Sequence, residues 1–422
     1  MSQKTDGSIR PQPTDERLFD HGWVIDYTRW IISRIVAECP SRWPASPDES
    51  KAQEILHGEL TACDSVAECV PYRFNSSLYG VIALHFALAI LAGLLVLVHP
   101  AIALITHLLV AISYFGDSQK RFFLLRRLLP WSEGHNLIVT YPAQGEVRSR
   151  VVLLAHADAA PTGWIFRPAL ARLCNENRYG GALTFLRKPL LVAVIILVLV
   201  ILIDLVMLTA GRSPWWLTVV YVLGHGYFLS VVLLTLQVVL NRQVVDGAND
   251  NLTSCAAIAV LARRFAAVPE EGVELVFGIT GGEEAGDGGS SALARDMRGR
   301  WDPSNTLVVA LECLGSGQLR VLEDGELFSH RTPDWLMTAV EQSAGAHQQP
   351  ISRYRLPAGC TDVLPFLVRG YEGTCFVRID PNNGVPENYH LPGDRPENLS
   401  YRQLAEAIDF TERFVREVSR LY

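Results

Sequence analysis

A histidine and an aspartate directly follow an apolar run in the sequence. Residues 151–155 read Val-Val-Leu-Leu-Ala, as in a buried strand, and His156 and Asp158 come next. In open α/β sheets ligands bind at the carboxyl ends of strands, and a carboxylate near a histidine can fix its tautomer for metal binding. Read alone, a His-x-Asp pair at this position is more often structural than catalytic.

Two adjacent glutamates follow a second apolar run. Residues 273–280 predict a buried strand, and the next segment, 281–286, contains Glu283 and Glu284. Its glycines could form a phosphate-binding loop, but two carboxylates would repel phosphate. Neighbouring side chains at a strand end point in different directions, so one glutamate can face a metal while the other stays free as a base.

Three further residues complete a set of metal ligands. Asp250 lies in a turn-rich loop before a predicted helix, Glu312 follows a predicted strand at 306–311, and His390 lies near the C-terminus. Asp250 alone would be interpreted as a helix cap. Together with the first histidine and one glutamate, these residues suit two divalent ions that share a bridging carboxylate about 3.5–4 Å apart. Zinc is the preferred ion for histidine and carboxylate ligands, although the ligand types also allow manganese or cobalt.

Alternating helices and strands must position these ligands. We predict an α/β fold with a mostly parallel mixed sheet and helices on both faces. The predicted strands are 136–140, 151–155, 273–280 and 306–311, and the predicted helices include 255–267 and 401–422.

Four apolar segments explain why 49% of the residues are hydrophobic and the mean hydropathy is +0.18. They are residues 79–98, 101–115, 189–210 and 215–240. A helix of about 20 residues spans the roughly 30 Å of a bilayer's hydrocarbon core. Short turns join the segments in pairs, so we predict four transmembrane helices inserted as two hairpins, 78–116 and 189–241. A buried helix of a soluble protein is the alternative, and it fits 101–115 best.

The charge and the cysteine content indicate which partners the protein can bind and in which cellular compartment it lies. The net charge of -7 gives no basic surface for nucleic acid. Eight cysteines without a regular spacing suggest reduced thiols, and residues 1–23 lack a secretory signal. Basic residues flank the hairpins and favour a cytoplasmic side, namely Lys120, Arg121, Arg126, Arg127, Arg187, Lys188 and Arg242. We predict an integral, multi-pass membrane protein with a cytoplasmic catalytic domain.

The motifs, in this order, resemble the co-catalytic di-zinc aminopeptidase family, which includes bacterial leucyl aminopeptidases, glutamate carboxypeptidase II and glutaminyl cyclases. The resemblance implies that Asp250 bridges two zinc ions. His156 and Glu312 would complete one site, and Glu284 and His390 would complete the other. The family usually has aspartate where this chain has Glu312, but a longer carboxylate can still bind the metal.

The resemblance also implies that Asp158 orients the first histidine and that Glu283 is the general base. Tyr389, next to the last ligand, is a candidate donor to the oxyanion, and a packing role is equally compatible with its position. The likeness extends to residues 39–46 and 361–366. It therefore implies a discontinuous catalytic domain after a polar tail, with the tail at 1–22 and the domain at 23–75, 130–185 and 243–422.

These features together predict a membrane-bound metallo-aminopeptidase that acts on a peptide or amino-acid amide. Related amide chemistry is the first alternative, as in a carboxypeptidase, an N-acyl-amino-acid hydrolase or a glutaminyl cyclase. A non-catalytic membrane receptor is the second alternative. Catalytically inactive relatives, however, lack some of the metal ligands, whereas this chain has all five.

Overall fold

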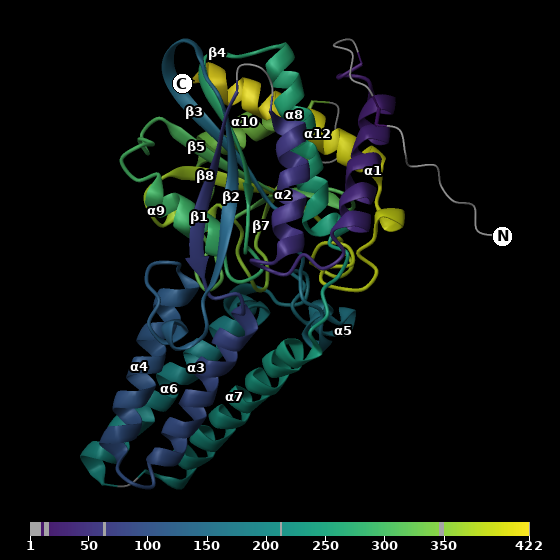
Figure 1. The fold of residues 1–422 in the computed structure, drawn as a ribbon. Helices are drawn as coiled ribbons and strands as arrows, with labels where there is room; N and C mark the ends of the chain where they lie inside the picture. Colours follow the sequence, from purple (N-terminus) through teal and green to yellow (C-terminus); the bar gives the residue numbers. More distant parts are fainter. Residues whose placement is uncertain (1–9, 12–16, 62–64, 212, 346–349, 422) are drawn as a thin grey trace, which may run out of the picture.

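The computed structural model describes residues 10–11, 17–61, 65–211, 213–345 and 350–421. Figure 1 shows an α/β part built on a sheet, and a bundle of long helices that extends from one end of it. Most of the polar tail predicted at 1–22 lies outside the described residues.

One eight-stranded sheet forms the centre of the α/β part, in the order β1-β2-β4-β3-β5-β8-β6-β7. The four central strands β4, β3, β5 and β8 are parallel, whereas β1, β2 and β6 join antiparallel neighbours. The predicted mostly parallel mixed sheet is therefore confirmed. The strands are β1 (Val66–Phe74), β2 (Ser132–Tyr141), β3 (Gln144–His156), β4 (Glu271–Thr280), β5 (Thr306–Glu312), β6 (Gln318–Leu322), β7 (Arg353–Tyr354) and β8 (Glu372–Ile379).

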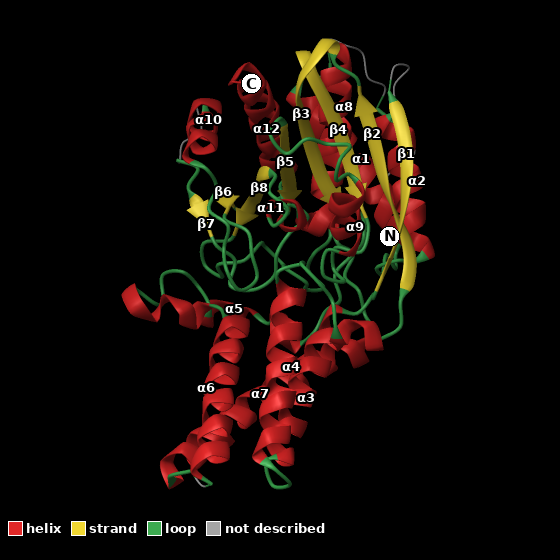
Figure 2. Ribbon diagram, turned by 90° about the vertical axis from the view of Figure 1, so that its left-hand side faces the viewer, coloured by secondary structure: helices red, strands yellow, loops and turns green. Residues whose placement is uncertain are grey.

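Helices cover both faces of this sheet, as Figure 2 shows. One face packs against α1 (His21–Glu38), α2 (Pro47–Leu60), α8 (Thr253–Ala267) and α12 (Tyr401–Leu421), with α10 (Asp334–Ala344) beside α12. The shorter α9 (Gly288–Asp296) and α11 (Leu364–Leu367) lie on the other face. Because both faces are covered, every residue of β5 is buried, which explains its continuous apolar sequence.

The bundle consists of α3 (Leu78–Leu95), α4 (Pro100–Ser118), α6 (Pro189–Ala210) and α7 (Trp215–Asn241). The short α5 (Pro168–Leu173) lies between α4 and α6 in the sequence. All four helices are long and apolar enough to cross a membrane. Only 28% of the most apolar window of α6 and 22% of that of α7 are buried inside the protein. The helices therefore direct large apolar side chains outward, Leu202 and Leu223 among them. Water would not solvate such a surface favourably.

The carboxyl ends of the central strands face the bundle. β1 and β4 both run antiparallel to β2, so they share one direction. β1 ends at Phe74 and α3 begins at Leu78, which places the start of the bundle at this edge of the sheet. The edge expected to carry the metal ligands is therefore the edge nearest the apolar helices.

Buried ion pairs join the end of α4 to the segment that follows β4. The Lys120 ammonium lies 3.1 Å from the Asp287 carboxylate, and both side chains are 1% exposed. The Arg126 guanidinium binds both oxygens of Asp117 at 2.7 and 2.8 Å and donates to the carbonyl of Ala285. Two of the basic residues predicted to flank the first hairpin are thus buried structural cations, because nearby carboxylates neutralise them.

Candidate metal centre

Six side chains that can bind metal meet at the carboxyl edge of the sheet. His156 and Glu312 are the last residues of β3 and β5, and two glycines separate the end of β4 from Glu283 and Glu284. Asp250 precedes α8, and His390 lies in the loop between β8 and α12. Parallel strands end together, so residues far apart in sequence become neighbours here.

Asp250 lies between the two histidines. Its Oδ1 is 3.3 Å from Nε2 of His156, and its Oδ2 is 3.3 Å from Nε2 of His390. Glu312 approaches the first histidine, with Oε1 3.3 Å from Nε2, and Glu284 Oε1 lies 3.5 Å from Nε2 of the second. Each oxygen of Asp250 therefore faces a different half of the site.

The donor atoms form two compact groups that share this aspartate. Those of His156, Asp250 and Glu312 lie within 4.8 Å of one another, and those of Asp250, Glu284 and His390 do likewise. A third group joins His156 to both adjacent glutamates. The first two groups have the same composition as the two ligand sets predicted from the sequence.

The electrostatics of the site favour bound cations. Burial raises the pKa of Glu312 to about 8 and that of Glu284 well above its usual range. Burial also acts on Asp250, but hydrogen bonds from both histidines outweigh it and lower the pKa of this carboxyl. Glu284 Oε1 and His390 Nδ1 are buried without a hydrogen-bond partner among the described residues. Divalent ions would compensate this concentration of buried carboxylates, and the imidazole and carboxylate donors suit zinc.

Asp158 supports the glutamate pair as well as the first histidine. Its two carboxylate oxygens accept hydrogen bonds from the backbone N–H groups of Glu283 and Glu284, at 3.2 and 2.9 Å. Its Oδ1 also lies 3.4 Å from Nδ1 of His156. The backbone carbonyl oxygen of Asp158 lies closer to the same Nδ1, at a hydrogen-bond distance of 3.2 Å. The orienting role of the Asp158 carboxylate stays a prediction, and its hydrogen bonds to the glutamate segment were not predicted.

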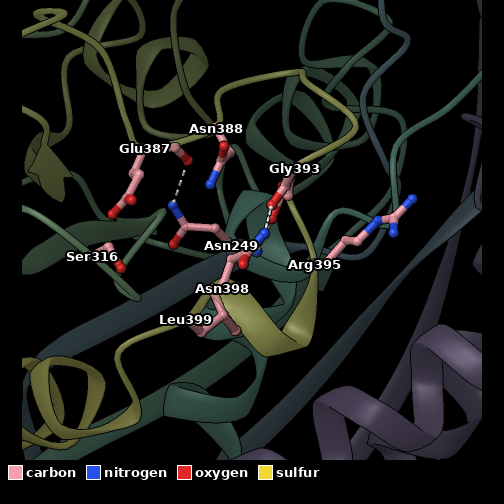
Figure 3. A pocket seen from close by; sticks show the side chains of 9 residues that line it. Asn249, Ser316, Glu387, Asn388, Gly393, Arg395, Asn398 and Leu399 are labelled. Atoms are coloured by element: carbon pink, nitrogen blue, oxygen red, sulfur yellow. Dashed lines mark hydrogen bonds between the residues drawn. The ribbon is translucent and has the colours of Figure 1, made fainter.

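A polar network holds the loops of Asp250 and His390 together. The Asp394 carboxylate accepts the backbone N–H groups of Asn249 and Asp250, at 2.6 and 3.1 Å. Figure 3 shows Asn249, whose side-chain amide donates to the Glu387 carbonyl at 3.3 Å. Residues of both loops line one small pocket, and the hydrogen bonds between them hold Asp250 and His390 at a fixed spacing.

Two supporting residues were missed by the sequence analysis. Asn251 donates to Glu312 Oε2 at 3.0 Å, which fixes the oxygen that faces away from His156. Glu49 Oε1 accepts the N–H of Gly282 at 2.7 Å, at the start of the glutamate segment. A signal existed for Glu49, since it stands three residues after Ser46 in a capping-box pattern, but that pattern indicates only a helix start.

Aromatic rings surround the second histidine. The centroid of Tyr389 lies 4.0 Å from that of His390, and the centroid of Phe166 lies 4.3 Å away on a different element. Tyr79, from the start of α3, packs against Phe166 at 5.8 Å. Burial, and then the charge of Asp250, raise the pKa of Tyr389 well above its usual range. The tyrosine hydroxyl therefore stays protonated and can act as a donor.

A cavity of about 580 Å³ reaches the metal centre from the side of the bundle. Glu284 forms part of its lining, with Tyr79 from α3 and Val238 from α7. The volume falls in the range of roughly 300–1,000 Å³ that is typical of small-molecule sites. The bundle therefore contributes part of the wall around the candidate active site.

Part of the chain matches a known protein family. Residues 225–415 match Peptidase family M28, a segment that contains Asp250, Glu283, Glu284, Glu312 and His390. His156 precedes the matched segment. No curated protein sequence matches the chain.

Several solved structures share the fold. A glutaminyl cyclase from an Acidobacteriales bacterium is 14% identical, with a TM-score of 0.54 over 100% of both chains. An aminopeptidase from Aneurinibacillus sp. strain AM-1 is also 14% identical, with a TM-score of 0.54 over 95% of each chain. BSAP, a zinc aminopeptidase from Bacillus subtilis, is 12% identical, with a TM-score of 0.55 over 93% of this chain and 95% of its own. The family match and the shared fold together identify the chain as a hydrolase of the metallopeptidase type, related to Peptidase family M28.

Proposed function

We propose that the protein is a membrane-bound aminopeptidase that uses two zinc ions to hydrolyse the amide bond after a free amino-terminal residue. The observation that carries this proposal is the sharing of Asp250 by two compact ligand groups, with Glu283 beside them. His156 and Glu312 would complete one zinc site, and Glu284 and His390 would complete the other.

Glu283 is proposed to be the general base. Its side chain is 12% exposed, more than those of the other carboxylates at the centre, and its Oε2 lies 3.7 Å from Nε2 of His156. Bound zinc would polarise the amide carbonyl and make a water molecule more acidic. Glu283 would accept a proton from the attacking water and pass it to the departing amine nitrogen, so that one water is consumed per amide bond broken.

Two other residues would assist this reaction. Asp158, through the N–H groups of Glu283 and Glu284, would keep the base and the neighbouring ligand in fixed positions. Tyr389 is proposed to donate a hydrogen bond to the oxyanion that forms on the substrate carbonyl. Its protonated hydroxyl and its place beside His390 support this role.

Zinc analysis of the purified chain, combined with a substrate panel, tests the proposal. Leucine amide should be hydrolysed and N-acetyl-leucine amide should not, because an aminopeptidase requires a free amine. Hydrolysis of only the acetylated substrate would instead favour an N-acyl-amino-acid hydrolase. Ring closure of a glutamine-initiated peptide would favour a glutaminyl cyclase, and absence of turnover on every substrate would favour a receptor.

Glu312→Ala should remove one of the two zinc ions and lower kcat strongly, because Glu312 belongs to only one ligand group. Metal analysis and steady-state kinetics measure both effects. Glu323→Ala is a matched control, because Glu323 is also buried but pairs with arginines away from the centre. Retention of both ions and near-normal turnover by Glu312→Ala would exclude Glu312 as a ligand.

We further propose that the four apolar helices cross the membrane as two hairpins and that the α/β part, a single discontinuous catalytic domain, is cytoplasmic. An even number of spans returns the chain to the side from which it started. Arg121 and Arg127 at the end of the first hairpin are exposed, and cations favour the cytoplasmic side. The seven described cysteines are free, which suits a reducing compartment.

Labelling in sealed cells tests this orientation. A cysteine introduced at Ser213, between α6 and α7, should react with a membrane-impermeant maleimide added outside. A cysteine at Arg295, an exposed position on α9, should react only after the cells are opened. The unmodified chain reports the background from native thiols. Labelling of the Arg295 position in sealed cells would place the α/β part outside and refute the topology, without affecting the metal centre.

A further inference from the structure

The cavity beside the metal centre has one cation in its lining. Of the described residues that form its wall, only Glu284 and Arg242 are charged. Glu284 belongs to a candidate ligand group and faces His390. Arg242 is therefore the group in this wall that can attract an anion.

Arg242 is free to bind such an anion. Its guanidinium makes no hydrogen bond or ion pair with any residue in the described part of the chain, and its side chain is exposed to the cavity. Other arginines near the metal centre are engaged. Arg42 donates to four backbone carbonyls, and Arg126 holds Asp117 and Ala285. The planar guanidinium of an unengaged arginine matches a carboxylate in a two-point contact.

The backbone holds Arg242 in an unusual conformation. It ends α7 with φ 49° and ψ 31°, a left-handed geometry in which glycine is the common choice. Such conformations in non-glycine residues concentrate at functional sites. Six other described non-glycine residues share a positive φ. Three of them lie at the metal centre: His390 is a ligand candidate, Cys313 follows Glu312, and the Asp287 N–H donates to the Glu283 carbonyl at 2.8 Å.

Seven of the nine other residues that line the cavity are apolar or aromatic, and the remaining two are Ser76 and Ser77. Leu78 and Tyr79 come from the start of α3, and Val238 and Val239 from the last turn of α7. Apolar side chains of the bundle therefore form part of the wall of this cavity, and Arg242 belongs to the same wall. A long polar peptide would find few partners in such a wall, whereas a short peptide with an apolar side chain would bury it there.

We propose that Arg242 binds the free carboxylate of a short peptide substrate, two or three residues long, with an apolar side chain after the scissile bond. The inference rests on the proposed aminopeptidase function and narrows its substrate class. Arg242 acts in recognition only, and the hydrolytic step is unchanged. An enzyme with this contact discriminates a peptide acid from the corresponding peptide amide, because the amide lacks the negative charge.

The test compares leucyl-leucine with leucyl-leucine amide, using the full chain with zinc in phosphatidylcholine nanodiscs. For the unmodified protein, kcat/KM should be about ten- to hundredfold higher for the acid, as expected for a hydrogen bond between charged groups. Arg242→Gln should bring the ratio of the two values close to one. Arg242→Gly serves as a second variant, because glycine favours the left-handed backbone and should preserve folding.

Arg127→Gln is the matched control. Arg127 is an exposed arginine on the same side of the α/β part, but it lies outside the cavity lining, so the acid-to-amide ratio should not change. Equal kcat/KM for acid and amide in the unmodified protein, or an unchanged ratio in both Arg242 variants, overturns the proposal. Failure to hydrolyse either substrate would contradict the proposed function instead.

A lipid phosphate is the competing anion, since Arg242 directly follows α7. In that case Arg242→Gln would lower kcat/KM for acid and amide equally, and only in nanodiscs that contain phosphatidylglycerol. That result would assign Arg242 to the membrane surface and overturn its role in substrate recognition.

Discussion

Replacement of Glu283 by glutamine is expected to lower kcat by about two to four orders of magnitude, the usual contribution of a general base. Glutamine keeps the size of the side chain but cannot accept a proton. Both zinc ions should remain bound, because neither of the two groups that share Asp250 includes Glu283. Stopped assays at high enzyme concentration, with metal analysis of the same samples, measure the two effects.

Substitution of the neighbouring Glu284 is expected to affect metal binding rather than proton transfer. Glu284→Ala should lose a zinc ion, because this carboxylate is in the group with Asp250 and His390. Glu271→Gln, at the opposite end of β4, makes the same chemical change as Glu283→Gln far from the centre and should leave activity intact. Equal metal loss in Glu283→Gln and Glu284→Ala would show that the base and the ligand have been assigned incorrectly.

Asp250→Ala is expected to remove both zinc ions and all measurable hydrolysis. One carboxylate is shared by both ligand groups, with Oδ1 toward His156 and Oδ2 toward His390. Its loss therefore disables both sites, whereas Glu312→Ala disables one. Removal of metal should also lower the melting temperature, because ions that bind only the folded state stabilise it.

Metal content, activity and thermal unfolding should change together in this variant, and treatment of the unmodified protein with a chelator should reproduce the same changes. Asp246→Ala is the matched control, because Asp246 lies on the same loop with a side chain that is 41% exposed. If Asp250→Ala retained two ions per chain, the bridging role would be wrong and a single-metal mechanism would have to replace it.

The sequence predicted three of the four central strands, because burial on both faces leaves a continuous apolar run. The fourth, β8, was not predicted, although seven of its eight residues are buried. β3, β4 and β5 contain the predicted segments, and α8 begins two residues before the predicted start at 255. β1 was not predicted. Its solvent-exposed residues outnumber its buried ones, so it lacks the strong apolar signal of a central strand.

The candidate ligands could also be found from the sequence, for a physical reason. A polar residue directly after a buried strand must lie at the edge of the sheet, and parallel strands bring such residues to one edge. The order of the motifs also indicated the resemblance to zinc aminopeptidases. The match to Peptidase family M28 and the shared fold confirm this resemblance. Their individual roles remain predictions until the variants are measured.

The sequence by itself predicted a metal centre in this protein, whereas the tertiary structure decided which residues surround the candidate ligands. Apolar strands followed by histidines and carboxylates predict a metal centre, and they can be found in the sequence because each motif is local to a few residues. The burial of Lys120 against Asp287 and the support of Gly282 by Glu49 join residues more than 160 positions apart. The position of Arg242 in the cavity wall likewise depends on how α7 packs at the edge of the sheet. Such contacts follow from the packing of whole elements, which no local pattern encodes.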